Sequence, residues 1–461
     1  MRLSAWTHMW VMGEDSESCE KGGVIRMSST ERRLDPRGRQ AIIGAFLGFF
    51  VDMFDVWLPV IVLGPAISYF VPNTLGASTL SVVNSVVFVV TLVARPIGAL
   101  LFGHVADRFG RKRTAIISVT GFGITTLLMA CLPGYQTWGL ASLVLLIILR
   151  FIDGLFLAGE YTSASPLAME YCPREKRGFY GALIMSGFPL SYIVINFLTF
   201  LMLQVAPLNG PDAPYIHWGW RIPFFVGAAI SLLFVLYYKK FVPESELWER
   251  SERSINPLRT LFSAGNLKGF FQVWVMMNGF WLTSYMISAV IPGLLNKSLH
   301  LPQTTVTIVM LTSEVALFVA YLAAGMISQR IGRRTYLIWA GLVAAVVGGM
   351  LNYWLISTEW QGVWGIFILT ILIEVIVGNI WGLATTYINE RFRTNVRASG
   401  FGLGYSLAVV LPSFYAFYQI WLSRIVPAVY TELVLLIIGS ILVVIGAALG
   451  PETKDVDFAQ D

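Results

Sequence analysis

The sequence predicts an all-α integral membrane protein with twelve transmembrane helices in two pseudo-symmetric six-helix lobes. Composition is the first observation behind this prediction: 56% of the 461 residues are hydrophobic and only 13% are charged, whereas globular domains carry roughly 25% charged residues. The second observation is a set of twelve apolar stretches, each near or above the length of about 20 residues that spans a bilayer. The third is a sequence repeat that relates the two halves.

The repeat centres on a short basic motif between apolar stretches, which we expect to form a tight turn. Its first copy is GHVADRFGRKR at 103–113, and a degenerate copy, GMISQRIGRR, follows 222 residues later at 325–334. A second pair of segments, 170–177 and 390–397, each begins with Glu and ends with Arg at nearly the same offset. Two marker pairs at nearly one spacing indicate that the chain consists of two related halves.

The apolar stretches define the expected spans. In chain order they are 41–71, 77–103, 114–133, 139–169, 178–204, 220–242, 269–295, 304–328, 335–356, 362–388, 398–423 and 428–450. Prolines inside several spans would break a helix in water, but in a bundle neighbouring groups satisfy the freed backbone. We expect these prolines to mark positions where a moving helix can bend: Pro59, Pro65, Pro96, Pro189, Pro292 and Pro412.

The order of spans divides the chain into five parts. We expect a disordered cytoplasmic arm at 1–40, a six-helix lobe at 41–242, a linker at 243–268, a second six-helix lobe at 269–450 and a cytoplasmic tail at 451–461. The linker is charged and amphipathic, so we expect a short helix lying on the membrane surface.

The distribution of basic residues predicts the orientation. The arm, the loops on its side of the membrane and the tail hold 27 of the 32 lysines and arginines, and the opposite loops hold only Arg221, Lys297 and Arg424. Arg95 and Arg150 lie within spans. Because cytoplasmic loops carry the excess of Lys and Arg, we expect both termini in the cytoplasm of a multi-pass cell-membrane protein. The one-sided distribution also argues against a nucleic-acid partner.

Motifs of enzymes and metal sites are missing from the sequence. It contains no Walker A loop and no HExxH motif. Cys19, Cys131 and Cys172 are too scattered for a metal or redox site, and Ser163 and Ser165 have no histidine near them in sequence. We therefore expect no catalytic residues, no cofactor and no bound metal.

The basic motif is similar to the signature between the second and third spans of the major facilitator superfamily. Three further segments resemble that superfamily's metabolite:proton symporters: Arg95-Pro96-Ile-Gly98, Arg150-Phe-Ile-Asp153-Gly154 with the following Ala158-Gly159-Glu160, and Trp220-Arg221-Ile-Pro223. Asp52-Met-Phe-Asp55 also resembles the first span of sialate/lactate-type symporters. The resemblance covers residues 41–450 and implies the major facilitator fold, with alternating access to a site between the lobes.

Charged residues within the spans are the candidates for substrate and proton binding, because a charge in the bilayer core is costly unless it is paired or faces water. Asp52 lies about eleven residues into the first span, roughly 16 Å along the helix axis, and Asp55 is one turn further on the same face. Two close carboxylates repel each other and should hold one proton between them, which suits a proton carrier. The alternative is a purely structural network around Asp52.

The fourth span contributes three further candidates. Arg150 lies one turn before Asp153, and Glu160 lies seven residues after Asp153 on the same stripe. One interpretation is an Arg150–Asp153 ion pair that only holds the lobe together. The other is that Arg150 binds a substrate carboxylate with its planar guanidinium and that Glu160 is the proton-accepting acid.

In the second lobe, Glu314 and Glu374 lie mid-span with no Lys or Arg near them in their own spans. An unpaired acid in an apolar helix is most simply protonated at rest, so either residue could relay a proton or bind a substrate. By family analogy the cavity lining would include Asn278, Trp281, Tyr285, Asn379 and Trp381, although ordinary packing is an alternative for each.

The resemblance also implies a cytoplasmic gate at the basic motif. Asp107 would face the start of a second-lobe helix, where an acid suits the positive end of the helix dipole, and would pair with the Arg111 side of the turn. Gln329 stands at the position of Asp107 in the second copy, so the second latch should be weaker. The other expected members of the gate are Arg108, Arg177, Arg330, Arg333 and Arg397. Alternatively, the motif only anchors the protein to anionic lipid.

These observations together predict a secondary active transporter. We expect proton-coupled symport of a small organic solute, a carboxylate or a zwitterion, by a monomer whose partners are the solute, the proton and the lipid bilayer. A proton-driven antiporter that exports a drug or metabolite is the alternative within transport. A non-transporting nutrient sensor built on the same fold is the alternative outside it.

Overall fold

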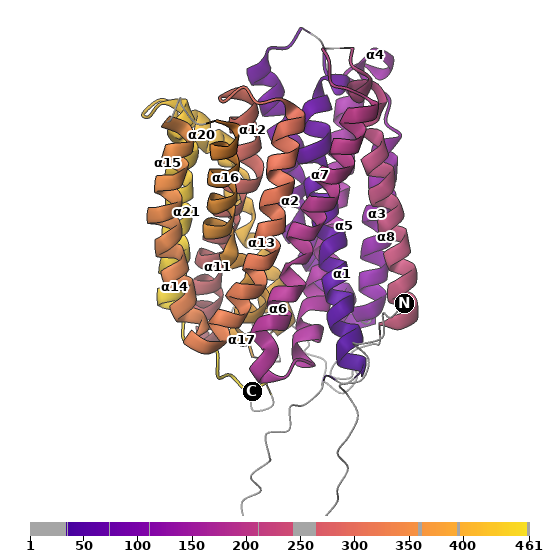
Figure 1. Ribbon diagram of the computed structural model, residues 1–461. Coiled ribbons are helices and arrows are strands. Elements are labelled where there is room, and N and C mark those ends of the chain that lie inside the picture. Colours follow the sequence, from indigo (N-terminus) through magenta and orange to yellow (C-terminus); the bar gives the residue numbers. More distant parts are fainter. Residues whose placement is uncertain are drawn as a thin grey trace, which may run out of the picture. The chain divides into compact units, whose positions relative to one another are not determined.

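The chain folds into a bundle of long helices whose axes run roughly in one direction (Figure 1). The structure is a computed structural model that describes residues 34, 36–72, 74–109, 111–210, 212–242, 264–357, 362–393 and 397–458. Within these ranges twelve helical stretches are long and apolar enough to cross a membrane, which confirms the predicted number of spans.

The first half of the chain supplies six of the spans. Its helices are α1 (Pro36–Leu58), η1 (Pro59–Leu63), η2 (Gly64–Phe70), α2 (Ala77–Phe109), α3 (Arg111–Ala130), α4 (Tyr135–Trp138), α5 (Leu140–Glu170), η3 (Arg174–Lys176), α6 (Arg177–Met185), α7 (Gly187–Val205), η4 (Tyr215–Gly219) and α8 (Arg221–Phe241). Several spans therefore consist of consecutive helical pieces.

The second half supplies the other six spans. Its helices are α11 (Ala264–Ser284), η5 (Tyr285–Val290), α12 (Ile291–Lys297), α13 (Gln303–Ile331), α14 (Arg333–Val343), η6 (Ala344–Gly348), α15 (Gly349–Ser357), α16 (Val363–Gly378), η7 (Asn379–Leu383), α17 (Ala384–Arg391), α18 (Arg397–Ala408), α19 (Val410–Ser413), α20 (Tyr415–Leu422), η8 (Ala428–Tyr430) and α21 (Thr431–Leu449).

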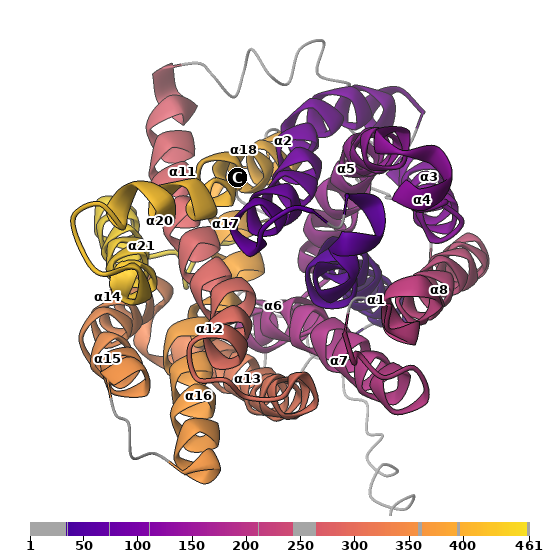
Figure 2. The same ribbon diagram turned by 90° about the horizontal axis from the view of Figure 1, so that it is seen from above.

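The helices of each half pack mainly on one another and form two lobes, as seen from above in Figure 2. In the first lobe α2 and α3 pack on α5, and in the second α11 packs on α21 and α13 on α16. The lobes meet where α13 packs on α6 and α7, and where α18 packs on α2 and α5. The fold is therefore the predicted pair of six-helix lobes.

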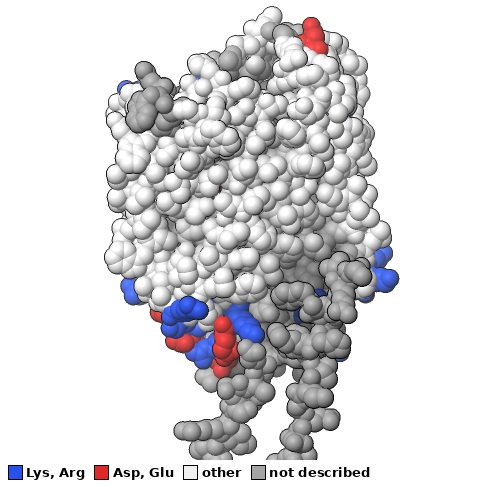
Figure 3. Space-filling model, viewed as in Figure 1, with Lys and Arg blue, Asp and Glu red and all other residues white. Residues whose placement is uncertain are grey.

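Charged side chains gather at one end of the bundle, which we call the charged face (Figure 3). It carries Arg174, Arg330, Arg334 and Asp455, and we call the other end the opposite face. Between them the visible surface consists almost entirely of uncharged side chains. Large apolar side chains point outward from this belt, as expected where lipid is the solvent.

Both copies of the basic motif are more helical than the predicted tight turn. α2 continues to Phe109 and α3 begins at Arg111, while α13 continues to Ile331 and α14 begins at Arg333. The second break is made by Gly332, whose φ of +103° is accessible to glycine but strained for other residues. In the second copy the turn is therefore a helix break at Gly332, because the residues before it continue the helix to Ile331.

The first and seventh spans, which the repeat relates, share a second irregularity. Each contains a π-helical segment toward the opposite face, η1 beginning at Pro59 and η5 just before Pro292. π-helical turns occur frequently at functional sites. By contrast, Pro96 lies inside the uninterrupted helix α2, so not every proline expected to permit bending breaks its helix.

Two predicted segments fall largely outside the described residues. These are the N-terminal arm, of which 1–33 are not described, and the linker helix, of which 243–263 are not described. At their boundaries α1 begins at Pro36 rather than at 41, and α11 begins at Ala264 rather than at 269. The boundaries of the lobes otherwise remain predictions.

Candidate functional site

Arg95 and Asp52 form a buried ion pair between α2 and α1. Arg95 Nη2 donates to the two carboxylate oxygens of Asp52, at 2.7 and 3.0 Å. Among the described residues none accepts a hydrogen bond from Arg95 Nε or Nη1, although both atoms are buried. Arg95 interacts electrostatically with Tyr285 and Tyr405 of the second lobe. An arginine with two unused donors near the interface between the lobes is suited to a carboxylate ligand.

A second buried cluster lies inside the first lobe. Arg150 Nη1 is 2.8 Å from Asp153 Oδ2 and 3.7 Å from Asp55 Oδ2. Thr125 Oγ1 donates to Asp153 at 2.8 Å, and Thr126 Oγ1 donates to Asp55. These contacts come from α1, α3 and α5 alone, so Arg150 is engaged within the lobe rather than at the interface.

Glu160 adds a further carboxyl group beside the first pair. It lies on α5 against Gly48 of α1, where a Cβ would overlap the Glu160 carboxyl group. It is 1% exposed and within electrostatic reach of Asp52 and Arg95. Two guanidinium groups in the first lobe thus accompany four buried carboxyl groups, those of Asp52, Asp55, Asp153 and Glu160. Counted by themselves, these six groups are electrically neutral only when they hold two protons, and an uncompensated charge is costly to bury.

These contacts bear on three parts of the prediction. Asp52 and Asp55 remain within electrostatic reach of each other, but each lies beside a different arginine, and the acid closest to Asp55 is Asp153. Arg150 makes the ion pair with Asp153 that the first interpretation expects. Arg95 is not among the predicted site residues, although, like Arg150, it is a charged residue within an apolar span.

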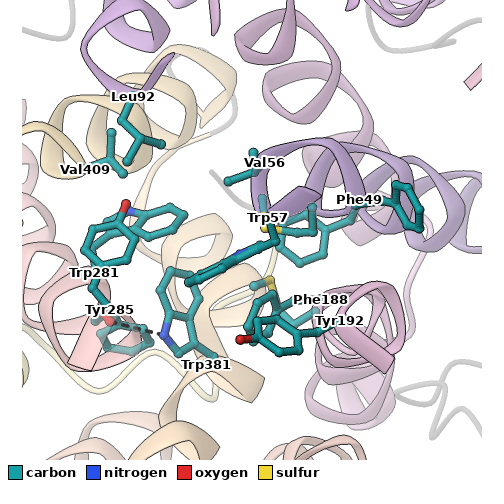
Figure 4. Packing of buried hydrophobic residues seen from close by; sticks show 14 of the residues in the cluster. Phe49, Val56, Trp57, Leu92, Phe188, Tyr192, Trp281, Tyr285, Trp381 and Val409 are labelled. Atoms are coloured by element: carbon teal, nitrogen blue, oxygen red, sulfur yellow. Dashed lines mark hydrogen bonds between the residues drawn. The ribbon is translucent and has the colours of Figure 1, made fainter. Parts of the chain in front are cut away.

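Aromatic side chains from both lobes fill the space near Arg95. Trp57 packs against Tyr192 with ring centroids 5.4 Å apart and against Tyr285 at 6.2 Å. Trp281 lies 4.8 Å from Trp381 and 5.7 Å from Tyr285. Figure 4 shows Trp57 reaching from the first lobe toward these second-lobe residues. We call the set Trp57, Tyr192, Trp281, Tyr285 and Trp381 the aromatic cluster.

A cavity of about 930 Å³ lies between the lobes toward the opposite face. Tyr192, Phe88 and Tyr415 line it, and the last two also pack against Tyr285, at 5.4 and 5.6 Å. Phe88, Tyr415 and the aromatic cluster together form a layer, here called the aromatic layer, between the cavity and Arg95. Polar side chains that line the cavity include Ser81, Asn84, Asn196, Asn296, Lys297, Gln303, Gln419 and Glu432.

The predicted cavity-lining residues have other positions in this structure. Trp281, Tyr285 and Trp381 belong to the aromatic cluster, which lies between the cavity and Arg95. Asn278 donates to the Trp274 carbonyl within its own helix, and Asn379 accepts a hydrogen bond from Tyr336 of α14 at 2.7 Å. Neither asparagine is among the residues lining the cavity. None of the five residues expected from the family analogy therefore lines this cavity, and a role for them in binding stays a prediction.

Besides Glu390 at the charged face, three described glutamates are buried in the second lobe. Glu314 of α13 and Glu374 of α16 interact electrostatically with each other, and no described group makes a hydrogen bond to either carboxyl group. Glu432 of α21 accepts a hydrogen bond from Asn352 at 2.8 Å and also lines the cavity. Glu432 was not predicted, because an acid in the first turn of a helix has an ordinary role at the positive end of the dipole.

Glycines bring the lobes into backbone contact at the charged face. A Cβ at Gly178 of α6 or Gly325 of α13 would overlap the carbonyl oxygen of the other. Gln329 accepts hydrogen bonds from the Gly178 N–H at 3.1 Å and from Arg333 Nη2 at 2.6 Å, and donates to the Arg174 carbonyl at 3.3 Å. The neutral amide, expected to weaken the second latch, thus supplies both an acceptor and a donor across the interface.

The repeated Glu…Arg segments also meet at the charged face. Arg397 Nη1 of the second lobe lies 3.3 Å from Glu170 Oε1 of the first. In the reciprocal pair, Arg177 of the first lobe interacts electrostatically with Glu390 of the second. Glu390 accepts hydrogen bonds from Arg333 as well, with the shortest distance 3.3 Å. The charged face is therefore closed by contacts that would have to break for the lobes to separate there.

Not every predicted gate residue joins these contacts. The Arg330 side chain is exposed, and its carbonyl accepts a hydrogen bond from Lys454 Nζ at 3.3 Å. The side chains of Asp107, Arg108 and Arg111 lie outside the described part of the chain. Their roles in the gate stay predictions.

Comparison with known proteins agrees with this geometry. A family model described as Major Facilitator Superfamily matches residues 45–416. The alpha-ketoglutarate permease of Escherichia coli (strain K12) is 29% identical over 83% of this chain and 86% of its own length. The proline/betaine transporter of the same strain is 25% identical over 87% of this chain and 82% of its own length.

A solved structure of the proton:xylose symporter XylE, bound to 6-bromo-6-deoxy-D-glucose, shows the same fold. It superposes with a TM-score of 0.71 at 16% identity, over 93% of this chain and 100% of that one. The match covers both lobes. The chain is thus a multi-pass membrane transporter, not an enzyme, and belongs to the major facilitator superfamily, where its relatives include metabolite transport proteins, an alpha-ketoglutarate permease and a proline/betaine transporter.

Proposed function

We propose that this protein is a proton-coupled symporter that imports a small organic carboxylate or zwitterion. The observation that carries the proposal is the Asp52–Arg95 pair, with two unused Arg95 donors and more carboxyl than guanidinium groups around it. A substrate carboxylate would accept hydrogen bonds from Arg95 Nε and Nη1. The excess carboxyl groups would hold the transported proton.

Coupling follows from the charge balance of this site. A substrate carboxylate adds one negative charge beside Asp52 and Glu160, so its binding favours protonation of one of these acids. In turn, a proton on Asp52 weakens its hold on Arg95 and favours substrate binding. The two ligands therefore stabilise each other through one coupling free energy. The lobes would rearrange most readily when both are bound and the site is neutral.

The site would be reached from each side of the membrane in turn. We take the charged face to be cytoplasmic, with both termini on that side of the cell membrane and one chain acting alone. In the present state the cavity at the opposite face would receive the substrate, and the aromatic layer would have to part. The π-helical segments η1 and η5 flank this layer and are suited to the bending. Release of the substrate into the cytoplasm would require the contacts at the charged face to break.

The aromatic cluster favours one substrate class in particular. Aromatic cages bind quaternary ammonium groups through the electron-rich ring faces, and here Trp281, Tyr285 and Trp381 lie close to an arginine that can take a carboxylate. A betaine-like zwitterion would satisfy both. The proline/betaine relative is consistent with this class, whereas the alpha-ketoglutarate relative is consistent with a carboxylate lacking the cationic end.

Uptake into proteoliposomes tests the proposal. Purified protein is given labelled dicarboxylates, monocarboxylates, betaine and neutral sugars, with and without an inward proton gradient. Gradient-driven accumulation of a carboxylate or betaine, lost in Arg95→Gln, is expected. Accumulation of neutral sugars alone would contradict the role of Arg95. Outward transport driven by the gradient would instead indicate the antiporter alternative, and binding without transport the sensor.

A further inference from the structure

Residues 451–458 cross the charged face, and we call them the C-terminal arm. Their first part is fixed to the second lobe. The Glu452 carboxylate accepts hydrogen bonds from the first two backbone N–H groups of α14, at 2.7 and 3.1 Å, and so caps that helix. Thr453 Oγ1 donates to Glu390 at 2.9 Å. The arm is therefore carried by the second lobe.

The second part of the arm reaches the first lobe. Arg177 Nη1 donates to the Val456 carbonyl at 2.7 Å, and Arg174 Nη2 donates to Asp455 Oδ1 at 2.6 Å. Both arginines lie at the start of the fifth span. A segment attached to one lobe thus contacts the other at the point where the two lobes meet.

Phe458 lies between two arginines of different lobes. The guanidinium carbon of Arg177 is 3.5 Å from the ring centroid, and that of Arg397 is 3.8 Å from it. Two guanidinium groups cannot share one ring face at these distances, so each takes its own face. Each face of the ring attracts a cation, and the ring also separates two like charges. This arrangement requires both lobes to be in place.

We propose that the C-terminal arm is a built-in latch that holds the charged face closed, with Phe458 as its locking residue. When the lobes separate at this face, Arg177 and Arg397 move apart with them, and the ring can then contact only one. The Glu452 cap keeps the arm on the second lobe, ready to close again. The latch rests on the alternating-access part of the proposed function and is independent of the substrate or the coupling ion.

A distance measurement between the lobes tests the latch. Spin labels are placed at the exposed positions Lys176 and Arg330 in the full chain, with the native cysteines replaced, and double electron–electron resonance is recorded in lipid nanodiscs. Phe458→Ala removes both cation–π contacts and should raise the ratio of long to short distances about tenfold. No substrate or gradient is needed, so the result does not depend on whether proton symport is correct.

Matched variants separate the latch from a general loosening of the arm. Lys454→Ala, which removes only a contact of the arm with its own lobe, should leave the distances unchanged. Phe458→Trp should keep the closed population, because an aromatic face is retained. Phe458→Leu should resemble Phe458→Ala, because an alkyl side chain has no ring faces.

Two results would overturn the latch. One is a Phe458→Ala distance distribution equal to that of the unsubstituted arm, which would mean that the arm follows the lobes without holding them. The other is full retention of the closed population in Phe458→Leu, which would mean that the residue acts only by filling space.

Discussion

Adding one methyl group at Gly325 should open the charged face. An alanine Cβ at this position would overlap the Gly178 carbonyl and lie 2.6 Å from Ala182 Cβ, whereas ordinary contacts are 3.4–4 Å. At the second contact alone, α6 and α13 would have to separate by about 0.8 Å, the difference between 2.6 and 3.4 Å. The contacts of Gln329 across the same interface would lengthen with them.

The size of the effect follows from the cost of overpacking. Forcing extra methyl groups into a well-packed interface costs about 1–3 kcal/mol. The clash exists only while the charged face is closed, because the two glycines move apart with their lobes. The cost therefore falls on one state of the equilibrium, and it should shift the ratio of open to closed forms roughly five- to 150-fold.

The assay is again the distance between spin labels on the two lobes at the charged face. Gly293→Ala in α12 is the matched control, because a Cβ there would meet nothing within 4 Å. We expect a longer distance to gain population in Gly325→Ala and not in Gly293→Ala. If both variants gave the same closed distribution, the glycine contact would not determine how closely the lobes approach.

Three further predictions concern the buried groups. Glu160→Gln should retain substrate exchange between the two sides of a proteoliposome but lose accumulation driven by a pH gradient; unchanged accumulation would remove Glu160 from coupling. Asp52→Asn or Arg95→Gln alone should lower the free energy of unfolding in detergent by about 3–5 kcal/mol, because each leaves a buried charge unpaired. The double variant should lose less stability than the two single variants added together. Additive losses of stability would mean that the pair is not energetically coupled. Burial raises the pKa of the Cys172 thiol to about 12, so its reactive thiolate is scarce at pH 7.5. Maleimide should therefore label the exposed Cys131 but not Cys172, as measured by peptide mass spectrometry. Equal labelling of both would show that Cys172 is accessible.

The spans could be predicted because hydropathy and length determine them without reference to neighbours. The eighth span illustrates this: it was expected at 304–328, and α13 runs from Gln303 to Ile331. The expected and observed ends of this span differ at the basic motif, whose polar residues were expected to form a turn. They are helical because a helix can extend past the apolar core into the interface, and the break comes only at Gly332.

The candidate acids could likewise be predicted from their positions in apolar spans, but their partners could not. Which arginine pairs with Asp52 depends on how α1 and α2 are rotated against each other, and no sequence spacing encodes that rotation. The same holds for Phe458. Nothing in its sequence distinguishes it from another tail residue until Arg177 and Arg397 are brought to it by the two lobes.

Proton movement during transport tests the central claim most directly. Purified protein is reconstituted into liposomes that enclose a pH-sensitive dye, and the substrate identified by uptake is added outside. The interior should acidify with the unsubstituted protein, and the acidification should be lost in Asp52→Asn, although the substrate still exchanges across the membrane. Solute uptake without acidification in the unsubstituted protein, or undiminished acidification in Asp52→Asn, would contradict the account.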